Sequence, residues 1–312
     1  MSQLSSGIVG LPNVGKSTLF NALAQRRLAE TAARPFTTID PHEAVVGVPD
    51  VRLEKLSKII SPKETLPAIV TFIDIAGLVK GAHEGEGLGN QFLGKIREVD
   101  AIVHVVRAFY DPQVVHSNLT HEMGSLEQIY EDIDIINIEL ELGDITGKPT
   151  VIVLNVGEDD IKSSVTKDKI IAVSEKYKAD TLAISAKIEE ELIDFNESER
   201  KEYLKNMGLK GTGLERLIKY AYKMLDLITF YTIKGGSEVH AWSIKRGSSA
   251  LDAAATVHTD FARGFIKAEV VNVGDLLSAG GWKEVALQGK TRLEGKDYIV
   301  QDEDVVEFKF ST

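Results

Sequence analysis

One stretch near the start of the chain has the residue types and spacing of a phosphate-binding loop. Gly10, Gly15, Lys16 and Ser17 fit the pattern Gly, any four residues, Gly, Lys, then Ser or Thr. An apolar run at 6–9 precedes them, and a helical pattern at 18–25 follows. The glycines let backbone N–H groups converge on an anion, and the helix N-terminus adds partial positive charge. The stretch therefore predicts a nucleoside triphosphate site.

Within this loop each residue type suggests a role. Lys16 is expected to reach the β- and γ-phosphates and to assist catalysis, and the Ser17 hydroxyl to ligate Mg²⁺. The residues expected to contact the phosphates are Asn13, Val14, Gly15, Lys16, Ser17 and Thr18. The alternative, a glycine-rich turn that fits the pattern by chance, does not explain the flanking strand and helix.

Two later segments complete the magnesium side of such a site. The loop at 34–41 contains Thr37 and Thr38 between prolines. In P-loop GTPases a segment here supplies a threonine to Mg²⁺ and the γ-phosphate, so we expect Thr38 in that role, with Thr37 as the alternative. The β-branched run at 68–74 ends in Asp74, three residues before Gly77. Asp74 would hold Mg²⁺, and the Gly77 N–H would meet the γ-phosphate.

The residue that follows Gly77 bears on the rate of hydrolysis. Ras-like GTPases place a glutamine there to orient the attacking water. This chain has Leu78, whose side chain can neither donate nor accept a hydrogen bond. Either hydrolysis is slow or another group positions the water.

The base-binding side departs from the guanine-specific pattern. The strand pattern at 148–155 ends in Asn155, where guanine-specific proteins begin the sequence Asn-Lys-x-Asp. Here Val156 replaces the lysine and Glu158 replaces the aspartate. The longer Glu158 would place its carboxylate wrongly for guanine, so we expect selectivity for GTP to be lost, while Asn155 braces the P-loop. Ser185 and Ala186 follow the next strand pattern and would form a loop over the base.

Composition restricts the class of protein further. The 312 residues are 43% hydrophobic and 27% charged, as in ordinary globular proteins. There is no cysteine, which excludes disulfides and cysteine-based zinc sites. The formal net charge of −11 argues against non-specific nucleic-acid binding by the whole surface. No targeting or membrane-spanning segment is recognisable, so we expect a cytoplasmic monomer that has no membrane partner.

The pattern of predicted secondary structure changes near residue 228. Strands and helices alternate before it, which predicts an α/β P-loop NTPase of the Ras-like G-domain type over 1–228. Short strand patterns separated by glycine turns follow, which predict a β-grasp domain over 229–312. Lys plus Arg minus Asp plus Glu is 10 − 12 = −2 after residue 228 and 26 − 35 = −9 up to it. Some residues of the less acidic second part could form a contact surface or simply be core and solvated side chains: Trp242, Lys245, Arg246, Arg263, Phe265 and Lys267.

Together these features resemble the YchF family, the Obg-like ATPase subfamily of translation-associated P-loop proteins. The resemblance covers nearly the whole chain. The last two of its five stretches are typical of the TGS domain, a ubiquitin-like β-grasp module. The stretches are GLPNVGKSTLFNAL at 10–23, PFTTIDP at 35–41, DIAGLVKGAHEGEGLGNQFL at 74–93, HTDFARGFIKAEV at 258–270 and RLEGKDYIVQDEDVVEF at 292–308.

The resemblance implies a slow, Mg²⁺-dependent ATPase that prefers ATP to GTP and associates with ribosomes, with rRNA or tRNA as further candidate partners. His116 matches a loop histidine of the family, which makes it the candidate for orienting water; otherwise it would be a solvent-exposed loop residue. Asn13 stands where potassium-activated relatives carry an asparagine, so K⁺ is a candidate second cofactor. A true GTPase of the Obg class and a non-catalytic, nucleotide-gated binding module are the alternative functions.

One departure from the family pattern concerns the segment before the strand at 150. The family usually inserts a long helical hairpin between the helix that ends near Asp144 and this strand. Here the gap is 144–149, too short for a hairpin. The absence puts in doubt any partner binding that uses the hairpin, but not ATP binding.

Overall fold

The computed structural model describes residues 4–30, 42–75, 88–116 and 120–311. The chain forms two compact units. Of the described residues, the P-loop unit contains 4–30, 42–46, 71–75, 88–116 and 120–225, and the C-terminal unit contains 47–70 and 226–311. The sequence placed residues 47–70 in the first domain, but in the structure they pack with the C-terminal unit. None of the described helices is long and apolar enough to cross a membrane.

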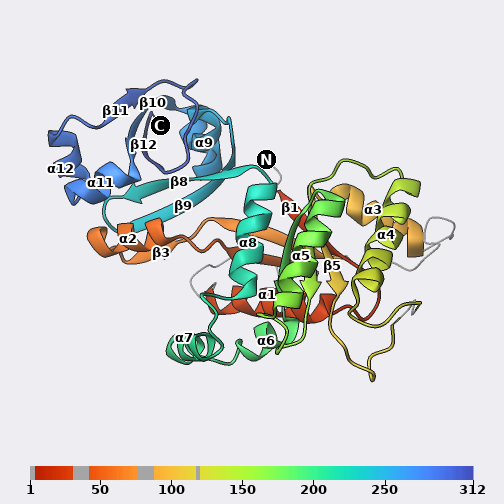
Figure 1. Ribbon diagram of the computed structural model, residues 1–312. Coiled ribbons are helices and arrows are strands. Elements are labelled where there is room, and N and C mark those ends of the chain that lie inside the picture. The colour runs from red at the N-terminus through yellow and green to blue at the C-terminus, as the bar shows by residue number, and fades with distance from the viewer. Residues whose placement is uncertain (1–3, 31–41, 76–87, 117–119, 312) are drawn as a thin grey trace. The chain divides into compact units, whose positions relative to one another are not determined.

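A six-stranded sheet forms the centre of the P-loop unit, with helices on both of its faces (Figure 1). The pairs β1–β4, β1–β5, β5–β6 and β6–β7 are parallel. In sheet order the strands are β2 (Glu43–Gly47), β4 (Ile69–Asp74), β1 (Ser5–Val9), β5 (Ala101–Arg107), β6 (Thr150–Asn155) and β7 (Asp180–Ile184). All residues of β1 and β5 are buried, as expected for strands covered on both faces. The carboxyl ends of parallel strands meet at one edge, where open α/β sheets bind ligands.

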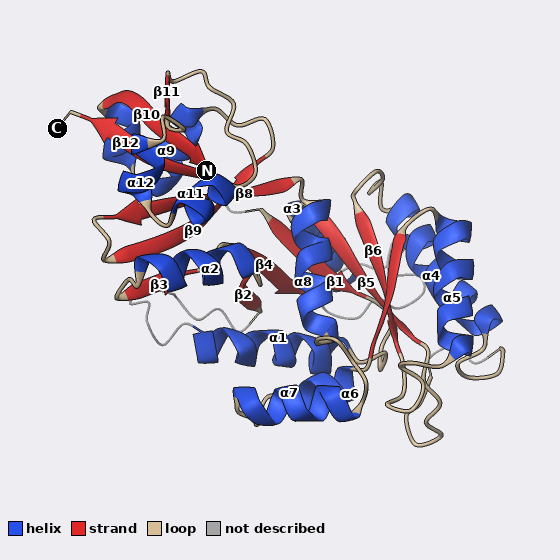
Figure 2. Cartoon of the chain, turned by 60° about the vertical axis from the view of Figure 1, so that its left-hand side comes forward, coloured by secondary structure: helices blue, strands red, loops and turns tan. Residues whose placement is uncertain are grey.

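Most helices of this unit begin where the sequence supplies a capping side chain. Ser125, Ser163 and Ser185 each accept a hydrogen bond from a backbone N–H in the first turn of the helix that follows. The helices are α1 (Lys16–Glu30), α3 (Leu88–Glu98), α4 (Leu126–Leu142), α5 (Ser164–Tyr177), α6 (Ala186–Glu191), α7 (Glu197–Asn206) and α8 (Gly213–Met224). Helices α1 and α6 lie side by side, at the edge where β1 and β7 end (Figure 2).

The connection between α4 and β6 begins with a C-cap motif that ends α4. Asp144 adopts a left-handed conformation, with φ of 56°. Its N–H donates to Glu141, and the N–H of Ile145 donates to Leu140 at 2.8 Å, which is the Schellman arrangement. Arg97 of α3 donates to the Gly143 carbonyl at 2.6 Å. The short link at 143–149 is therefore ordered and pinned, and it contains no helical hairpin.

The C-terminal unit is built on a mixed six-stranded sheet. The β8–β9 hairpin is antiparallel, β12 runs parallel to β8, and β10 is antiparallel to β12. In sheet order the strands are β11 (Arg292–Glu294), β10 (Phe265–Asn272), β12 (Asp304–Phe310), β8 (Leu227–Lys234), β9 (Glu238–Lys245) and β3 (Glu64–Leu66). The helices are α2 (Val51–Ile60), α9 (Ala250–Val257), α10 (Thr259–Arg263), α11 (Val273–Ala279) and α12 (Trp282–Leu287). Alanines of α9 pack on Phe230, Val306 and Phe308 in the core.

Several contacts attach residues 47–70 to the C-terminal unit. Strand β3 pairs with β9, and Ser243 donates to the Ile69 carbonyl at 3.0 Å. Asp50 caps α2 and accepts a hydrogen bond from the buried Tyr231 hydroxyl at 2.5 Å. Arg52 donates to Glu303 at 2.8 Å. Burial raises the pKa of Asp50, but the hydrogen bonds from Arg52 and Tyr231 outweigh that and leave it below its usual value.

Candidate functional site

The loop between β1 and α1 is shaped by two glycines that no other residue could replace. Gly10 has φ of +156°, and a Cβ there would lie 2.3 Å from the Val105 carbonyl oxygen. Gly15 has φ of +95°, and a Cβ there would lie 2.2 Å from the Asn155 amide nitrogen. Both positions therefore require glycine, because a side chain would collide with fixed atoms and favour a different backbone conformation. The backbone between β1 and α1 therefore has the glycine-dependent conformation expected of the predicted P-loop.

The Lys16 amine is held inside this loop. Its side chain is buried, and Nζ donates to the Leu11 carbonyl at 2.7 Å. Burial lowers the pKa of Lys16 to about 8, and the negative charge of Asp74, at the end of β4, acts in the opposite direction. A negatively charged phosphate oxygen is a stronger hydrogen-bond acceptor for the Lys16 amine than the neutral Leu11 carbonyl. We therefore expect the amine to turn from Leu11 to a bound phosphate.

Asn155 ties the phosphate side of the site to the base side. Its Nδ2 donates to the Val14 carbonyl at 2.9 Å, and its Oδ1 accepts from the Ala186 N–H at 3.0 Å. Asn155 itself ends β6 and is buried. One amide thus fixes the P-loop and the loop after β7 at once. Val14 is buried, and its carbonyl accepts the hydrogen bond from Asn155.

These groups surround a cavity of about 610 Å³. It lies at the carboxyl edge of the parallel sheet, and all of its lining residues belong to the P-loop unit. They are Asn13, Gly15, Lys16, Ser17 and Thr18 from the P-loop; Phe109, Tyr110, Asp111 and Val114 after β5; Asn155, Val156, Gly157 and Glu158 after β6; and Ser185, Ala186, Lys187 and Glu190 after β7. The structure therefore brings together the phosphate-side and base-side residues predicted from the sequence.

The base side contains an ion pair that the sequence did not reveal. Lys187 Nζ lies 2.5 Å from Glu158 Oε1, with the lysine largely exposed. The carboxylate of Glu158 is therefore engaged by a cation that follows Ala186 by one residue. The sequence alone does not predict this pair, because it forms only where the loop after β6 meets the loop after β7.

The outer wall of the cavity is held by Arg107, which the sequence analysis also missed. This residue ends β5, and its guanidinium donates to the carbonyls of Asp111 at 2.8 Å and Val114 at 2.9 Å. Gln128 of α4 donates in turn to the Arg107 carbonyl at 3.1 Å. Burial lowers the pKa of Arg107, with Asp111 and Asp132 acting against it. Hydrogen bonds from Arg107 thus hold loop 108–114 in a fixed conformation at the edge of the cavity.

The magnesium side is described only in part. Ser17 lines the cavity, and Asp74 lies close enough to Lys16 to act on its charge. The backbone N–H of Asp74 donates to the His42 carbonyl at 2.9 Å. Thr37, Thr38, Gly77 and Leu78 lie outside the described residues. Within the described ranges, no group of three or more acidic or histidine side chains is arranged to hold a metal ion.

The structure does not place His116 at the cavity. Its Nε2 lies 3.0 Å from Oδ2 of Asp132 on α4, and each of the two side chains is 2% exposed. It is absent from the residues that line the cavity. His116 is therefore neither an exposed loop histidine nor, in this conformation, a group that faces the phosphates. Burial raises the pKa of Asp132, and the hydrogen bond from His116 opposes that shift.

The chain matches two family models. One, described as a 50S ribosome-binding GTPase, matches residues 5–156. The other is the C-terminal domain model of the YchF GTPases, described as a protein of unknown function, and it matches residues 227–311. The two matches cover the parts of the chain that contain the P-loop and the mixed sheet.

Full-length relatives extend this likeness. The chain is 40% identical to the ribosome-binding ATPase YchF of Bacillus subtilis, over 99% of each chain. It is 38% identical to the protein of the same name from Escherichia coli O157:H7, over 98% of each chain. The structure of the Schizosaccharomyces pombe YchF GTPase superposes with a TM-score of 0.83 at 31% identity, covering 99% of this chain and 98% of that one.

The Bacillus subtilis comparison also shows that this chain is shorter. The alignment is 371 positions long, and the chain has 312 residues, so at least 371 − 312 = 59 positions have no residue here. The pinned link at 143–149 is where the sequence predicts a missing hairpin. With two family models and near-complete relatives in agreement, the chain belongs to the YchF family.

Proposed function

We propose that the protein is a slow ATP-hydrolysing switch that associates with ribosomes. Its relatives bear the name ribosome-binding ATPase YchF. The observation that carries the proposal is the cavity that joins the Lys16 amine, the Asn155 brace and the Glu158 carboxylate. Such a cavity suits a nucleoside triphosphate, since cation and backbone N–H groups lie at one end and a partly apolar base site at the other.

Selectivity for ATP follows from Glu158 and Val156. A guanine-specific site presents a free aspartate to the base and a lysine along the ring. Here the carboxylate is longer and is paired with Lys187, while Val156 is buried and offers only apolar contact. Guanine would lose its two hydrogen bonds to the carboxylate, which leaves adenine as the preferred base. GTP is expected to bind more weakly.

Magnesium fits the oxygen donors of this site. Ser17 would contribute its hydroxyl and Asp74 its carboxylate, the former directly and the latter through water, and Thr38 and Gly77 would sense the γ-phosphate. Mg²⁺ keeps several waters and phosphate oxygens as ligands, so few protein ligands suffice. Asn13 remains the candidate for K⁺ activation; it has φ of 61°, and its amide nitrogen donates to the Val115 carbonyl at 3.2 Å.

Slow hydrolysis is proposed from Leu78 and from the position of His116. Leu78 supplies no group that could orient water. For His116 to act, its imidazole would have to leave Asp132 and move toward the cavity. Single-turnover hydrolysis by His116→Ala tests this role: a lower rate with unchanged ATP affinity supports it, and a wild-type rate removes His116 from the mechanism.

For the C-terminal unit we propose a TGS-type β-grasp domain. The order β9–β8–β12–β10–β11, with an antiparallel hairpin, a parallel central pair and α9 packed against the sheet, supports this assignment. We further propose a cytoplasmic monomer with an Obg-type nucleotide domain. Ribosomal RNA and tRNA are its candidate nucleic-acid partners.

Phosphate release under multiple turnover tests the proposed activity. With Mg²⁺ and excess ATP, the wild-type chain should release more than one phosphate per protein, and Lys16→Ala should release none. Absence of turnover in the wild type, with ATP still bound, would make the chain a nucleotide-gated binding module. Because the similar structure from Schizosaccharomyces pombe is named a GTPase, the same assay is run with GTP.

A further inference from the structure

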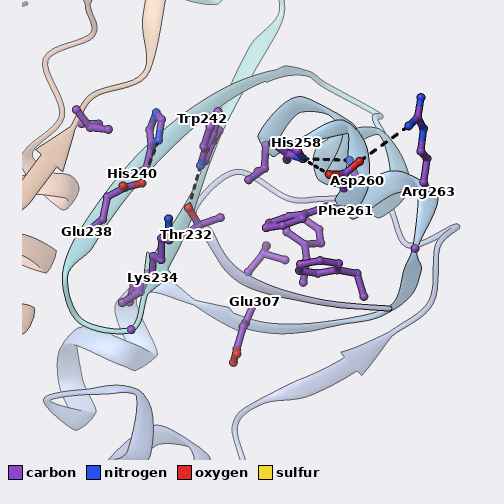
Figure 3. A pocket seen from close by; sticks show the side chains of 18 of the residues that line it. Thr232, Lys234, Glu238, His240, Trp242, His258, Asp260, Phe261, Arg263 and Glu307 are labelled. Atoms are coloured by element: carbon purple, nitrogen blue, oxygen red, sulfur yellow. Dashed lines mark hydrogen bonds and ion pairs between the residues drawn. The ribbon is translucent and has the colours of Figure 1, made fainter. Parts of the chain in front are cut away.

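The C-terminal unit contains a cavity of about 1110 Å³ that is distinct from the nucleotide site. The β8–β9 hairpin and β12 form its floor, and α10 stands at its side (Figure 3). Phe261 stacks on Phe310 with ring centroids 4.2 Å apart. The Trp242 ring stacks on His240 at 3.6 Å, and its Nε1 donates to Thr232 at 2.9 Å. These rings and the indole N–H are partnered within the domain, and the contacts name no ligand.

The contact between His116 and Asp132 in the P-loop unit is of a different kind. Each side chain is 2% exposed, and His116 Nε2 lies 3.0 Å from Asp132 Oδ2. Gln128 Nε2 donates to the same oxygen. The other oxygen, Oδ1, is buried and has no hydrogen-bond partner among the described residues. A buried carboxylate is costly unless its oxygens are hydrogen-bonded, so packing alone does not explain why an aspartate stands here.

The chain just before His116 lies at the outer wall of the nucleotide cavity. Arg107 holds loop 108–114 by hydrogen bonds to its carbonyls. Asn13, which lines the cavity, donates to the Val115 carbonyl at 3.2 Å. His116 thus follows a residue that is bonded to the P-loop, although its own imidazole is turned to Asp132 on α4. Because Arg107 and Asn13 anchor the preceding residues, the imidazole can leave Asp132 while the wall of the cavity stays in place.

Asp132 keeps a partner when the imidazole leaves. Gln128 is buried, and its Oε1 accepts from the Gly124 N–H at 2.8 Å. Its Nε2 donates to the Arg107 carbonyl at 3.1 Å as well as to Asp132, so the amide is fixed. The positive charge of Arg107 also lies close enough to act on Asp132. The carboxylate is therefore compensated both with His116 bound to it and with His116 away from it.

We propose that Asp132 is a positioning residue that holds His116 in a resting position and thereby keeps ATP hydrolysis slow. Hydrolysis then depends on the small fraction of molecules in which the imidazole has left Asp132. The proposal rests on the proposed function in one respect, namely that His116 orients the attacking water. It adds that the contact with Asp132 sets the rate together with Leu78.

An aspartate bonded to a histidine can have the opposite role. In the Ser-His-Asp triad the aspartate orients an imidazole that faces the reacting atoms. His116, while it is bonded to Asp132, is not among the residues that line the nucleotide cavity. Removal of an orienting aspartate lowers the rate, and removal of an aspartate that holds the histidine at rest raises it. The sign of the change therefore decides between the two roles.

Single-turnover hydrolysis of ATP by the full chain, with Mg²⁺, measures this sign. Asp132→Ala removes the acceptor and should raise the rate about tenfold, as expected for loss of a buried hydrogen bond to a carboxylate. Asp132→Asn keeps the shape and leaves an uncharged hydrogen bond, so the rise should be about threefold. This variant also covers the case in which the alanine variant unfolds. The ATP dissociation constant should not change, because Asp132 does not line the cavity.

Two further variants show whether the effect passes through His116. Asp134→Asn changes an aspartate two residues along α4 that pairs with Lys176 and Tyr177, and it should hydrolyse ATP at the wild-type rate. The double variant Asp132→Ala with His116→Ala should hydrolyse ATP no faster than His116→Ala alone, since no imidazole remains to be released. General loosening of the unit would raise the rate of the double variant above that of His116→Ala.

Chemical modification gives a readout that does not need hydrolysis. Diethyl pyrocarbonate acylates accessible imidazole nitrogens, and peptide mass spectrometry measures the rate at each histidine. In the nucleotide-free chain, His116 should react about tenfold faster in Asp132→Ala than in the wild type, because the released fraction rises by the same factor as the hydrolysis rate. His258, whose side chain is 58% exposed, is the internal reference and should react equally in both.

The results separate failure of the proposal from failure of the proposed function. A lower or an unchanged hydrolysis rate in both Asp132 variants, with ATP affinity retained and with His116→Ala slower than the wild type, overturns the proposal alone. Equal modification of His116 in Asp132→Ala and in the wild type overturns it as well. Wild-type hydrolysis by His116→Ala refutes the proposed role of His116 and, with it, the effect of Asp132 on the rate.

Discussion

The two cavities of this molecule are built from different parts of the chain. The cavity of the P-loop unit is shaped largely by backbone: Gly10 and Gly15 adopt conformations that side chains would prevent, and carbonyls hold Lys16 and Asn155. The cavity of the C-terminal unit is shaped by aromatic side chains from β9, α10 and β12. A site made of backbone geometry requires fixed residue types at fixed spacing. A site made of ring surfaces does not.

The first and largest prediction tests the chemistry of the backbone-built cavity. Lys16→Ala should weaken ATP binding by about 100-fold or more, because it removes a buried charge-assisted donor to the phosphates. Isothermal titration calorimetry with Mg²⁺ measures the change. Lys95→Ala, which removes an exposed lysine on α3, is the matched control and should bind ATP as the wild type does.

The second prediction sharpens the comparison by separating the two hydrogen bonds of Asn155. Asn155→Ala should weaken ATP binding by about tenfold, since two buried backbone groups lose their partner. Asn155→Asp should be at least as damaging, because a carboxylate oxygen would face the Val14 carbonyl. Asn196→Ala removes the cap of α7, a side chain that does not line the cavity, and should cost about 1 kcal/mol of stability with no loss of ATP affinity. ATP binding by Asn155→Asp equal to that of the wild type would contradict the bracing role.

The difference between a site built from backbone and a site built from side chains also explains which residues could be predicted from the sequence. The P-loop, Asp74, Asn155 and the Ser185–Ala186 loop were predicted because each follows a strand at a fixed distance. The Glu158–Lys187 pair and the Arg107 wall were not, because they depend on loops that meet only in the folded sheet. His116 was predicted from a resemblance, and its burial against Asp132 depends on α4, 16 residues away.

In the C-terminal unit the sequence predicted a small mixed domain but not its extent. Residues 47–70 read as a continuation of the P-loop unit, since a helix and a strand pattern follow β2 in the usual order. The contacts that place them elsewhere join Asp50 to Tyr231 and Arg52 to Glu303, across at least 181 positions. No local pattern encodes such pairs.

The third prediction tests this assignment of residues 47–70. Tyr231→Phe removes the hydroxyl that donates to Asp50 and should lower the free energy of unfolding by about 1.5–3 kcal/mol, as for other hydrogen bonds to charged groups. ATP affinity should not change, because the contact lies inside the C-terminal unit. Tyr220→Phe, on α8, is the control for the substitution itself. A large loss of ATP affinity in Tyr231→Phe would show that this contact supports the P-loop unit as well, against the assignment.

The fourth prediction concerns the interior of the P-loop unit. His104 is buried on β5, and burial, with a contribution from Lys16, lowers its pKa to about 3. The unfolded chain therefore binds a proton below about pH 6.5 that the folded chain does not, so this residue makes stability fall with falling pH. The loss should approach about 1.4 kcal/mol per pH unit between pH 5.5 and 4.5. Denaturant unfolding of the wild type and of His104→Gln measures it; parallel pH profiles would contradict the buried, neutral histidine.

The central claim is that the backbone-built cavity binds ATP in preference to GTP because Glu158 is engaged by Lys187 and Val156 stands where a lysine would pack on guanine. The most direct test is to measure the dissociation constants of ATP and GTP by calorimetry, with Mg²⁺, on one preparation of the wild-type chain. The account predicts that ATP binds at least about tenfold more tightly. GTP binding as tightly as ATP, or more tightly, would contradict it.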